Sequence, residues 1–231
     1  KMGKVDTIAF DKTGTLTYGR LDVSDIISFE ENISETELLA LAASAEARSE
    51  HPLGKAIVAH AAAKGVTLTE AEDFKMTAGK GILAEVSGRR LICGNEKFLT
   101  ENGASIGQKV QAALERLRTQ GKASILVADG RKCIGVIALA DVLRPEAKDM
   151  VSRLADMDTR TVLLTGDHQK TADYFAKQVG ISGVRAELLP EEKVQNIEKL
   201  QKENHTVCMI GGGVNDAQAP KTVDVRVAMG S

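Results

Sequence analysis

The residues best suited to chemistry are an aspartate and its neighbours near the start of the chain. Asp11 directly follows a short β-prone segment, residues 5–10, and opens the run Asp11-Lys12-Thr13-Gly14-Thr15. A carboxylate beside Mg²⁺ can attack the γ-phosphorus of ATP and form an aspartyl phosphate. Asp11 is one candidate for such chemistry, although such a run taken alone also fits an ordinary loop.

Other polar residues follow later predicted strands. They are Thr165, Gly166 and Asp167 after residues 160–164, and Asn215 and Asp216 after residues 206–210. Carboxylates gathered at one sheet edge repel each other unless a cation lies among them, and Mg²⁺ prefers hard oxygen ligands together with phosphate. Lys193, in the first turn of a helix opened by Pro190, could direct its ammonium to the same place. Without these neighbours it would equally be a solvated lysine.

The elements that must position these residues alternate between strand and helix. Helices are predicted from Pro145, over residues 172–179 up to Gly180, and from Pro190, and strands over residues 5–10, 160–164, near Val184 and over 206–210. Apolar residues recur at helical spacing in the helices. This alternation predicts an α/β domain, with a mostly parallel, Rossmann-like sheet covered by helices on both faces.

The middle of the chain has a different pattern. A capping box at residues 34–37 and the pair His51-Pro52 each open a predicted helix, and a third helix covers residues 110–117. Turn signals at Ser87-Gly88 and Asp129-Gly130 predict two hairpins. This is an α+β insert. We expect a discontinuous α/β domain of residues 1–18 and 141–231, into which residues 19–140 are inserted as a second domain.

Composition excludes several classes of protein. The 231 residues suffice for one large or two small domains, and the formal charge of -2 gives no reason to expect nucleic acid. Cys93, Cys133 and Cys208 form no CxxC pair and are expected to be reduced thiols. No apolar run approaches the roughly 20 residues of a membrane span, so we expect the chain as given to be soluble.

Residues 11–17, Asp-Lys-Thr-Gly-Thr-Leu-Thr, resemble the phosphorylation signature of P-type ATPases, members of the haloacid dehalogenase superfamily. Thr165-Gly166-Asp167, Lys193 and Gly213-Val214-Asn215-Asp216 follow in that family's order. The resemblance implies that Asp11 is the nucleophile and that Thr13 offers its carbonyl to Mg²⁺. It further implies that Thr165 and Lys193 hold phosphate oxygens, that Asp167 supports nucleotide or loop closure, and that Asn215 and Asp216 complete the surroundings.

Thr13 separates this reading from its main alternative, a soluble haloacid dehalogenase-type phosphatase. Phosphatase relatives carry a second aspartate two positions after the nucleophile, as general acid and base. A hydroxyl is a poor general base near neutral pH, so an aspartyl phosphate here should be hydrolysed slowly.

One position departs from the family's pattern. The family has Gly-Asp-Gly where this chain has Gly211-Gly212-Gly213, so the usual third Mg²⁺ ligand beside Asp11 and Thr13 is missing. Either Mg²⁺ binding is weakened, or water and Asp216 fill the gap. We predict reduced Mg²⁺ affinity and slow phosphorylation. A non-catalytic nucleotide-binding module remains a further alternative.

The insert carries a second set of candidate residues. Each is weak alone, but together they resemble the ATP site of the heavy-metal P1B subgroup, which has Ser-Glu-His-Pro-Leu, Gly-x-Gly-Ile and Gly-Asn. The implied ATP contacts are Glu46, His51, Gly79, Gly81, Ile82, Gly94 and Asn95. Glu46 could accept a hydrogen bond from the adenine amino group, and His51 could pack on the ring.

The subgroup's membrane helices and its actuator Thr-Gly-Glu are not found in this sequence. We therefore expect a monomeric catalytic fragment of a membrane transporter's cytoplasmic part. It would use ATP and Mg²⁺, and its partners would be ATP or ADP and the transporter's remaining domains.

Overall fold

The computed structural model describes residues 6–156, 159–203, 206–211 and 225–228. The chain forms two compact units. Unit 1 comprises the chain up to Arg20, residues 119–121 and the chain from Asp141 onward, and unit 2 comprises residues 21–118 and 122–140. Among the described residues, no helix combines the length and the apolar character that a membrane crossing requires.

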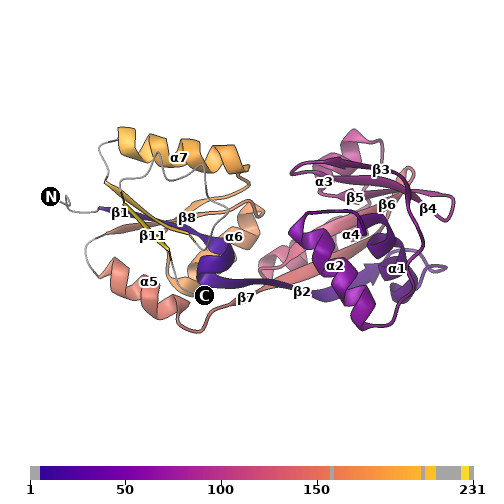
Figure 1. Cartoon of the computed structure of the whole chain (residues 1–231), viewed down its shortest axis with the longest axis horizontal. Helices are drawn as coiled ribbons and strands as arrows, with labels where there is room; N and C mark the ends of the chain where they lie inside the picture. Colours follow the sequence, from indigo (N-terminus) through magenta and orange to yellow (C-terminus); the bar gives the residue numbers. More distant parts are fainter. Residues whose placement is uncertain (1–5, 157–158, 204–205, 212–224, 229–231) are drawn as a thin grey trace. The chain divides into compact units, whose positions relative to one another are not determined.

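Unit 1 is built on a parallel sheet with strand order β11-β10-β1-β8-β9 (Figure 1). Its strands are β1 (Thr7–Asp11), β8 (Arg160–Leu164), β9 (Gly183–Arg185), β10 (Val207–Gly211) and β11 (Val225–Ala228). Its helices are α5 (Ala147–Ala155), α6 (Gln169–Val179) and α7 (Pro190–Lys202), and a π-helical turn, η1 (Lys12–Leu16), follows β1.

Alternating side chains of β1 explain why helices cover both faces of this sheet. Ile8 and Phe10 pack with α5 and α6, whereas Ala9 packs with α7. Figure 1 shows α5 and α7 on opposite sides of the sheet. Successive residues of a strand point to opposite faces, so a strand covered on both faces is apolar throughout its interior. The predicted α/β fold class is confirmed.

Unit 2 contains a six-stranded sheet with order β2-β7-β6-β5-β4-β3, antiparallel from β7 to β3. Its strands are β2 (Thr17–Ser28), β3 (Glu72–Thr77), β4 (Gly81–Val86), β5 (Arg89–Gly94), β6 (Ala123–Asp129) and β7 (Lys132–Leu143). Its helices are α1 (Glu35–Glu46), α2 (Pro52–Ala63), α3 (Glu96–Glu101) and α4 (Gln108–Thr119). The α1 and α2 pair packs on one face, and α3 and α4 pack on the other.

The two predicted hairpins are confirmed as β4–β5 and β6–β7. The predicted cap of α1 is present, since the Ser34 hydroxyl accepts a hydrogen bond from the Glu37 N–H at 3.1 Å. The sequence prediction missed β2, β3, β11 and α3. β2 contains Gly19, Asp22 and Asp25, residue types that are depleted in strands, which explains why its pattern gave no signal.

Candidate functional site

Asp11 and Lys193 meet at the carboxyl end of the parallel sheet. Asp11 is the last residue of β1, and the register pairs it with Leu164 of β8. Lys193 lies in the first turns of α7 and donates a hydrogen bond to Asp11 Oδ1 at 3.2 Å. Asp11 is only 9% exposed. The structure therefore places the predicted nucleophile in a buried position next to a cation.

Lys12 lies beside Asp11 and bridges two further carboxylates. Its ammonium is hydrogen-bonded to Asp167 and lies 3.7 Å from a carboxylate oxygen of Asp141. The same ammonium lies 5.3 Å from the centre of the Phe175 ring, a cation–π contact. Lys12 itself is 5% exposed. Two carboxylates and the face of an aromatic ring therefore compensate its buried charge.

Asp141 is the site residue that sequence reasoning missed. It lies near the end of β7, and its Oδ1 is buried without a hydrogen-bond partner. Burial raises the pKa of this carboxyl, while the charge of Lys12 acts in the opposite direction. The available signal was one acidic residue directly after the apolar residues 134–140. Periodicity cannot say which cation such a residue meets.

Thr165 and Gly166 form the loop that delivers Asp167. The Thr165 hydroxyl accepts a hydrogen bond from the Asp167 N–H at 3.1 Å, and the Thr165 N–H donates to the Arg185 carbonyl at 3.0 Å. These bonds fix the loop, so Asp167 faces Lys12. Thr13 lies in η1, but its side chain is outside the description. The predicted Asn215 and Asp216, and the departure at Gly212, also lie outside the described residues.

The oxygen ligands that this site offers suit a cation whose coordination is completed by a substrate. In the part of the chain that the structure describes, no three His, Cys, Asp or Glu residues are grouped to hold a metal ion. Mg²⁺ typically takes one or two carboxylates together with phosphate oxygens and water, and needs no cage made of protein alone. Asp11 with the backbone carbonyl of Thr13 fits that requirement.

In unit 2, Glu46 and His51 lie on either side of the turn between α1 and α2. Glu46 is 4% exposed, and burial raises its pKa to about 7 against the opposing hydrogen bond from Ser49. His51 caps α2, because its Nδ1 accepts a hydrogen bond from the Leu53 N–H at 3.1 Å. Burial lowers the pKa of His51. The buried Glu46 carboxyl and the His51 imidazole thus lie at the two ends of one short turn.

The predicted glycines pack backbone against backbone. Gly81 pairs with Gly94 across β4 and β5. A Cβ at Gly81 would lie 2.2 Å from the Cys93 carbonyl oxygen, and one at Gly94 would lie 2.3 Å from the Lys80 carbonyl oxygen. Only glycine allows this approach. These two glycines therefore have a packing role, whatever they bind.

The remaining predicted nucleotide residues surround this pair. Ile82 is buried in the core next to Gly81, and Gly79 lies in the preceding turn with a φ of 76°. Asn95 caps α3 by accepting a hydrogen bond from the Phe98 N–H at 2.8 Å. Burial raises the pKa of Cys93, the strand partner of Ile82, and the nearby charge of Glu46 raises it further. The end of α1 therefore lies close to these strands.

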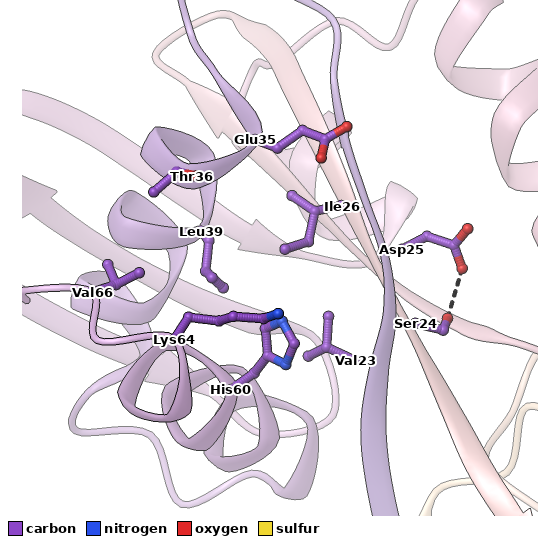
Figure 2. Close-up of a pocket in the computed structure, with 10 residues that line it drawn as sticks. All are labelled: Val23, Ser24, Asp25, Ile26, Glu35, Thr36, Leu39, His60, Lys64 and Val66. Carbon is purple, nitrogen blue, oxygen red and sulfur yellow. Dashed lines mark hydrogen bonds between the residues drawn. The ribbon is translucent and has the colours of Figure 1, made fainter.

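A separate cavity of about 490 Å³ lies beside α1 and α2, at the ends away from the Glu46 turn. Figure 2 shows Leu39 of α1, His60 of α2 and Lys64, which follows α2, around the cavity, facing Val23 and Ile26 of β2. Its lining includes none of the seven predicted nucleotide residues. The cavity is therefore not the predicted ATP site.

Comparisons with known proteins bear on the family and the fold of this chain. The family model of haloacid dehalogenase-like hydrolases matches residues 5–224. "Copper-exporting P-type ATPase B" of Archaeoglobus fulgidus is 41% identical over 227 residues, which are 98% of this chain and 32% of that protein. The catalytic domain of the CPx-ATPase CopB-B is 35% identical with a TM-score of 0.70, covering 98% of this chain and 78% of that one. A zinc-transporting PIB-type ATPase in its E2.Pi state gives a TM-score of 0.64 at 35% identity, over 98% of this chain and 36% of that one.

The chain belongs to the haloacid dehalogenase-like hydrolases. Within them it corresponds to the catalytic domain of heavy-metal P-type ATPases, which confirms the family resemblance found in the sequence. The chain spans about a third of the length of the curated relatives that it matches.

Proposed function

We propose that this chain binds ATP and phosphorylates itself on Asp11, as the catalytic part of a transporter that exports a heavy-metal cation. The observation that carries the proposal is the Lys193 ammonium 3.2 Å from Asp11 Oδ1 at the carboxyl end of the sheet. Ligands of open α/β sheets bind outside this edge. Copper and zinc appear in the names of the relatives, and we propose a cation of that class.

In the proposed reaction, an Asp11 carboxylate oxygen bonds to the γ-phosphorus of ATP. The bond from that phosphorus to the bridging oxygen breaks, and ADP leaves with the electron pair. Lys193 and Thr165 hold the phosphoryl oxygens, and Lys12 keeps Asp167 oriented through their hydrogen bond. Asp11 and the Thr13 carbonyl would hold Mg²⁺, which supplies positive charge to the phosphate oxygens. Positioning and charge compensation dominate this kind of transfer.

The two units take different parts in this proposal. Unit 1 contains the proposed phosphorylation domain, residues 1–18 and 141–231, to whose site Asn215 and Asp216 contribute. Residues 19–140 form the nucleotide-binding domain, in which Glu46, His51 and the glycine pair of β4 and β5 receive the adenine end of ATP. The partners are ATP or ADP and the membrane and actuator domains of the same transporter.

The test is to trap the intermediate. The chain is incubated with γ-labelled ATP and Mg²⁺, and acid-stable label that hydroxylamine removes is counted. We expect label on the natural chain and none on Asp11→Asn, a variant with nearly the same shape and no nucleophilic carboxylate.

Three other results would contradict parts of this proposal. Label that persists in Asp11→Asn contradicts the assignment of the nucleophile. ADP binding without label on the natural chain indicates a nucleotide-binding module, and rapid turnover of small phosphoesters indicates a soluble phosphatase.

A further inference from the structure

Gly54, in the first turn of α2, lies directly against the side chain of Glu46. A Cβ built on Gly54 would be 2.4 Å from Glu46 Oε2 and 2.9 Å from Ser49 Oγ. Both of these side chains are buried, at 4% and 6% exposure. Any side chain at position 54 would therefore occupy the space that the carboxylate now fills.

Ser49 connects this carboxylate to the start of α2. Its hydroxyl is hydrogen-bonded to the Glu46 carboxyl group, and its N–H donates to the Glu46 carbonyl at 2.8 Å. The Ser49 Oγ also accepts a hydrogen bond from the His51 N–H at 3.2 Å. Glu46, Ser49 and His51 thus form one connected group, and Gly54 closes it from the side of α2.

Helix stability gives no reason for a glycine at this position. Glycine destabilises a helix interior by roughly 1 kcal/mol relative to alanine, and α2 is otherwise rich in alanine. The close approach of the carboxylate does give a reason, since alanine would require Glu46 and Ser49 to move.

The geometry points to Gly54 as a positioning residue for the nucleotide site: its missing side chain lets the Glu46 carboxylate lie where it can accept a hydrogen bond from the adenine amino group. This inference rests on the proposed function, because the adenine contact of Glu46 is part of that proposal. Gly54 acts through Glu46 and Ser49 and does not itself touch the nucleotide.

The first experiment measures ADP affinity of the full chain by calorimetry for Gly54→Ala. Because the displaced group is the flexible end of a side chain, we expect the variant to fold while its ADP affinity falls about tenfold or more, the loss typical of a misplaced polar contact. Gly107→Ala is the matched control, since a Cβ at Gly107 meets nothing within 4 Å. It should bind ADP like the natural chain.

A second substitution makes the test specific. Glu46→Asp shortens the side chain by one methylene and withdraws the carboxylate from position 54. If the contact is the cause, the combined variant Glu46→Asp with Gly54→Ala should lose much less affinity than the sum of the two single effects. Strict additivity would contradict the inference.

The pH dependence of ADP affinity gives a readout that a purely structural role would not move. In the natural chain, affinity should rise with pH through about 7, where Glu46 ionises. In Gly54→Ala the displaced carboxyl should ionise at lower pH, so the midpoint should shift downward. Should Gly54→Ala fail to fold, Ser49→Ala tests the same group, with an upward shift of the midpoint expected and no shift overturning the inference.

The outcomes separate the two proposals. If the natural chain and Gly107→Ala bind no nucleotide, the proposed function fails. If they bind ADP and Gly54→Ala binds it equally well with the same pH profile, the proposed function stands and the role of Gly54 is wrong.

Discussion

In unit 1, the acidic side chains of the site are paired with ammonium groups. In unit 2, by contrast, a buried carboxyl is hydrogen-bonded to a hydroxyl and packs against a glycine. Asp11 is paired with Lys193, and Asp167 with Lys12. Glu46 has Ser49 as its hydrogen-bond partner and Gly54 against it. Removal of charge should therefore be most damaging in unit 1, and addition of bulk should be most damaging in unit 2.

The largest effect is expected from removing the cation next to Asp11. Lys193→Met keeps an unbranched side chain and removes the charge, so phosphorylation from ATP should slow by about 10²- to 10³-fold, as when one electrostatic donor is removed from an active site. ADP affinity should not change. Rapid-quench phosphorylation measures the rate.

Lys199→Met, at an exposed position of the same helix, is the control. Equal slowing in both variants would show that α7 as a whole was damaged, and that the Lys193 charge has no particular role.

A smaller effect, on stability, is expected from ionisation of the buried Glu46 carboxyl in unit 2. The pKa of Glu46 is raised from 4.5 to about 7, so the folded state binds a proton that the unfolded state has released between these values. Stability should therefore fall as pH rises through this window, by roughly 3 kcal/mol at most. Below pH 4.5 both states are protonated and this loss is absent.

Glu46→Gln has no such titration. Denaturant unfolding of both proteins between pH 4.5 and 8 isolates the contribution of Glu46 to stability. The contributions of the other titrating groups cancel when the two free energies of unfolding are subtracted. Parallel stability curves would contradict the raised pKa and weaken the contrast between the units.

The next effect concerns bulk in unit 2. Gly81→Ala places a methyl group 2.2 Å from a backbone carbonyl oxygen, which cannot rotate away. We expect a loss of about 1–3 kcal/mol in the free energy of unfolding, typical of overpacking. Gly107→Ala should change it by less than about 0.5 kcal/mol. Equal stabilities would show that the β4–β5 contact is not restrictive.

The smallest effect is expected from restoring the carboxylate that the family pattern has at position 212. Gly212→Asp should lower the Mg²⁺ concentration for half-maximal phosphorylation by about tenfold, the lower end of effects seen for groups around metal sites. Phosphorylation is titrated with Mg²⁺ for both chains. The same Mg²⁺ dependence in both would refute the prediction of weakened binding.

The sequence by itself determined the fold class and which residues were candidates for the chemistry. Strand and helix periods, the Ser34 cap and the two hairpin turns are local signals, because each depends on residues close together in the chain. The signature from Asp11 to Thr17 predicts which residue is the nucleophile. The long strand β2 was missed because its polar residues and glycine obscure the alternation.

Only the tertiary structure decided which side chains meet. Lys12 could have bonded any nearby carboxylate, and its contacts with Asp167 and Asp141 join segments more than a hundred residues apart. The fit of Gly54 against Glu46 depends on how two helices pack, to within a fraction of an ångström. Composition and spacing carry no such information, since the volume left for a side chain is a property of the packed core.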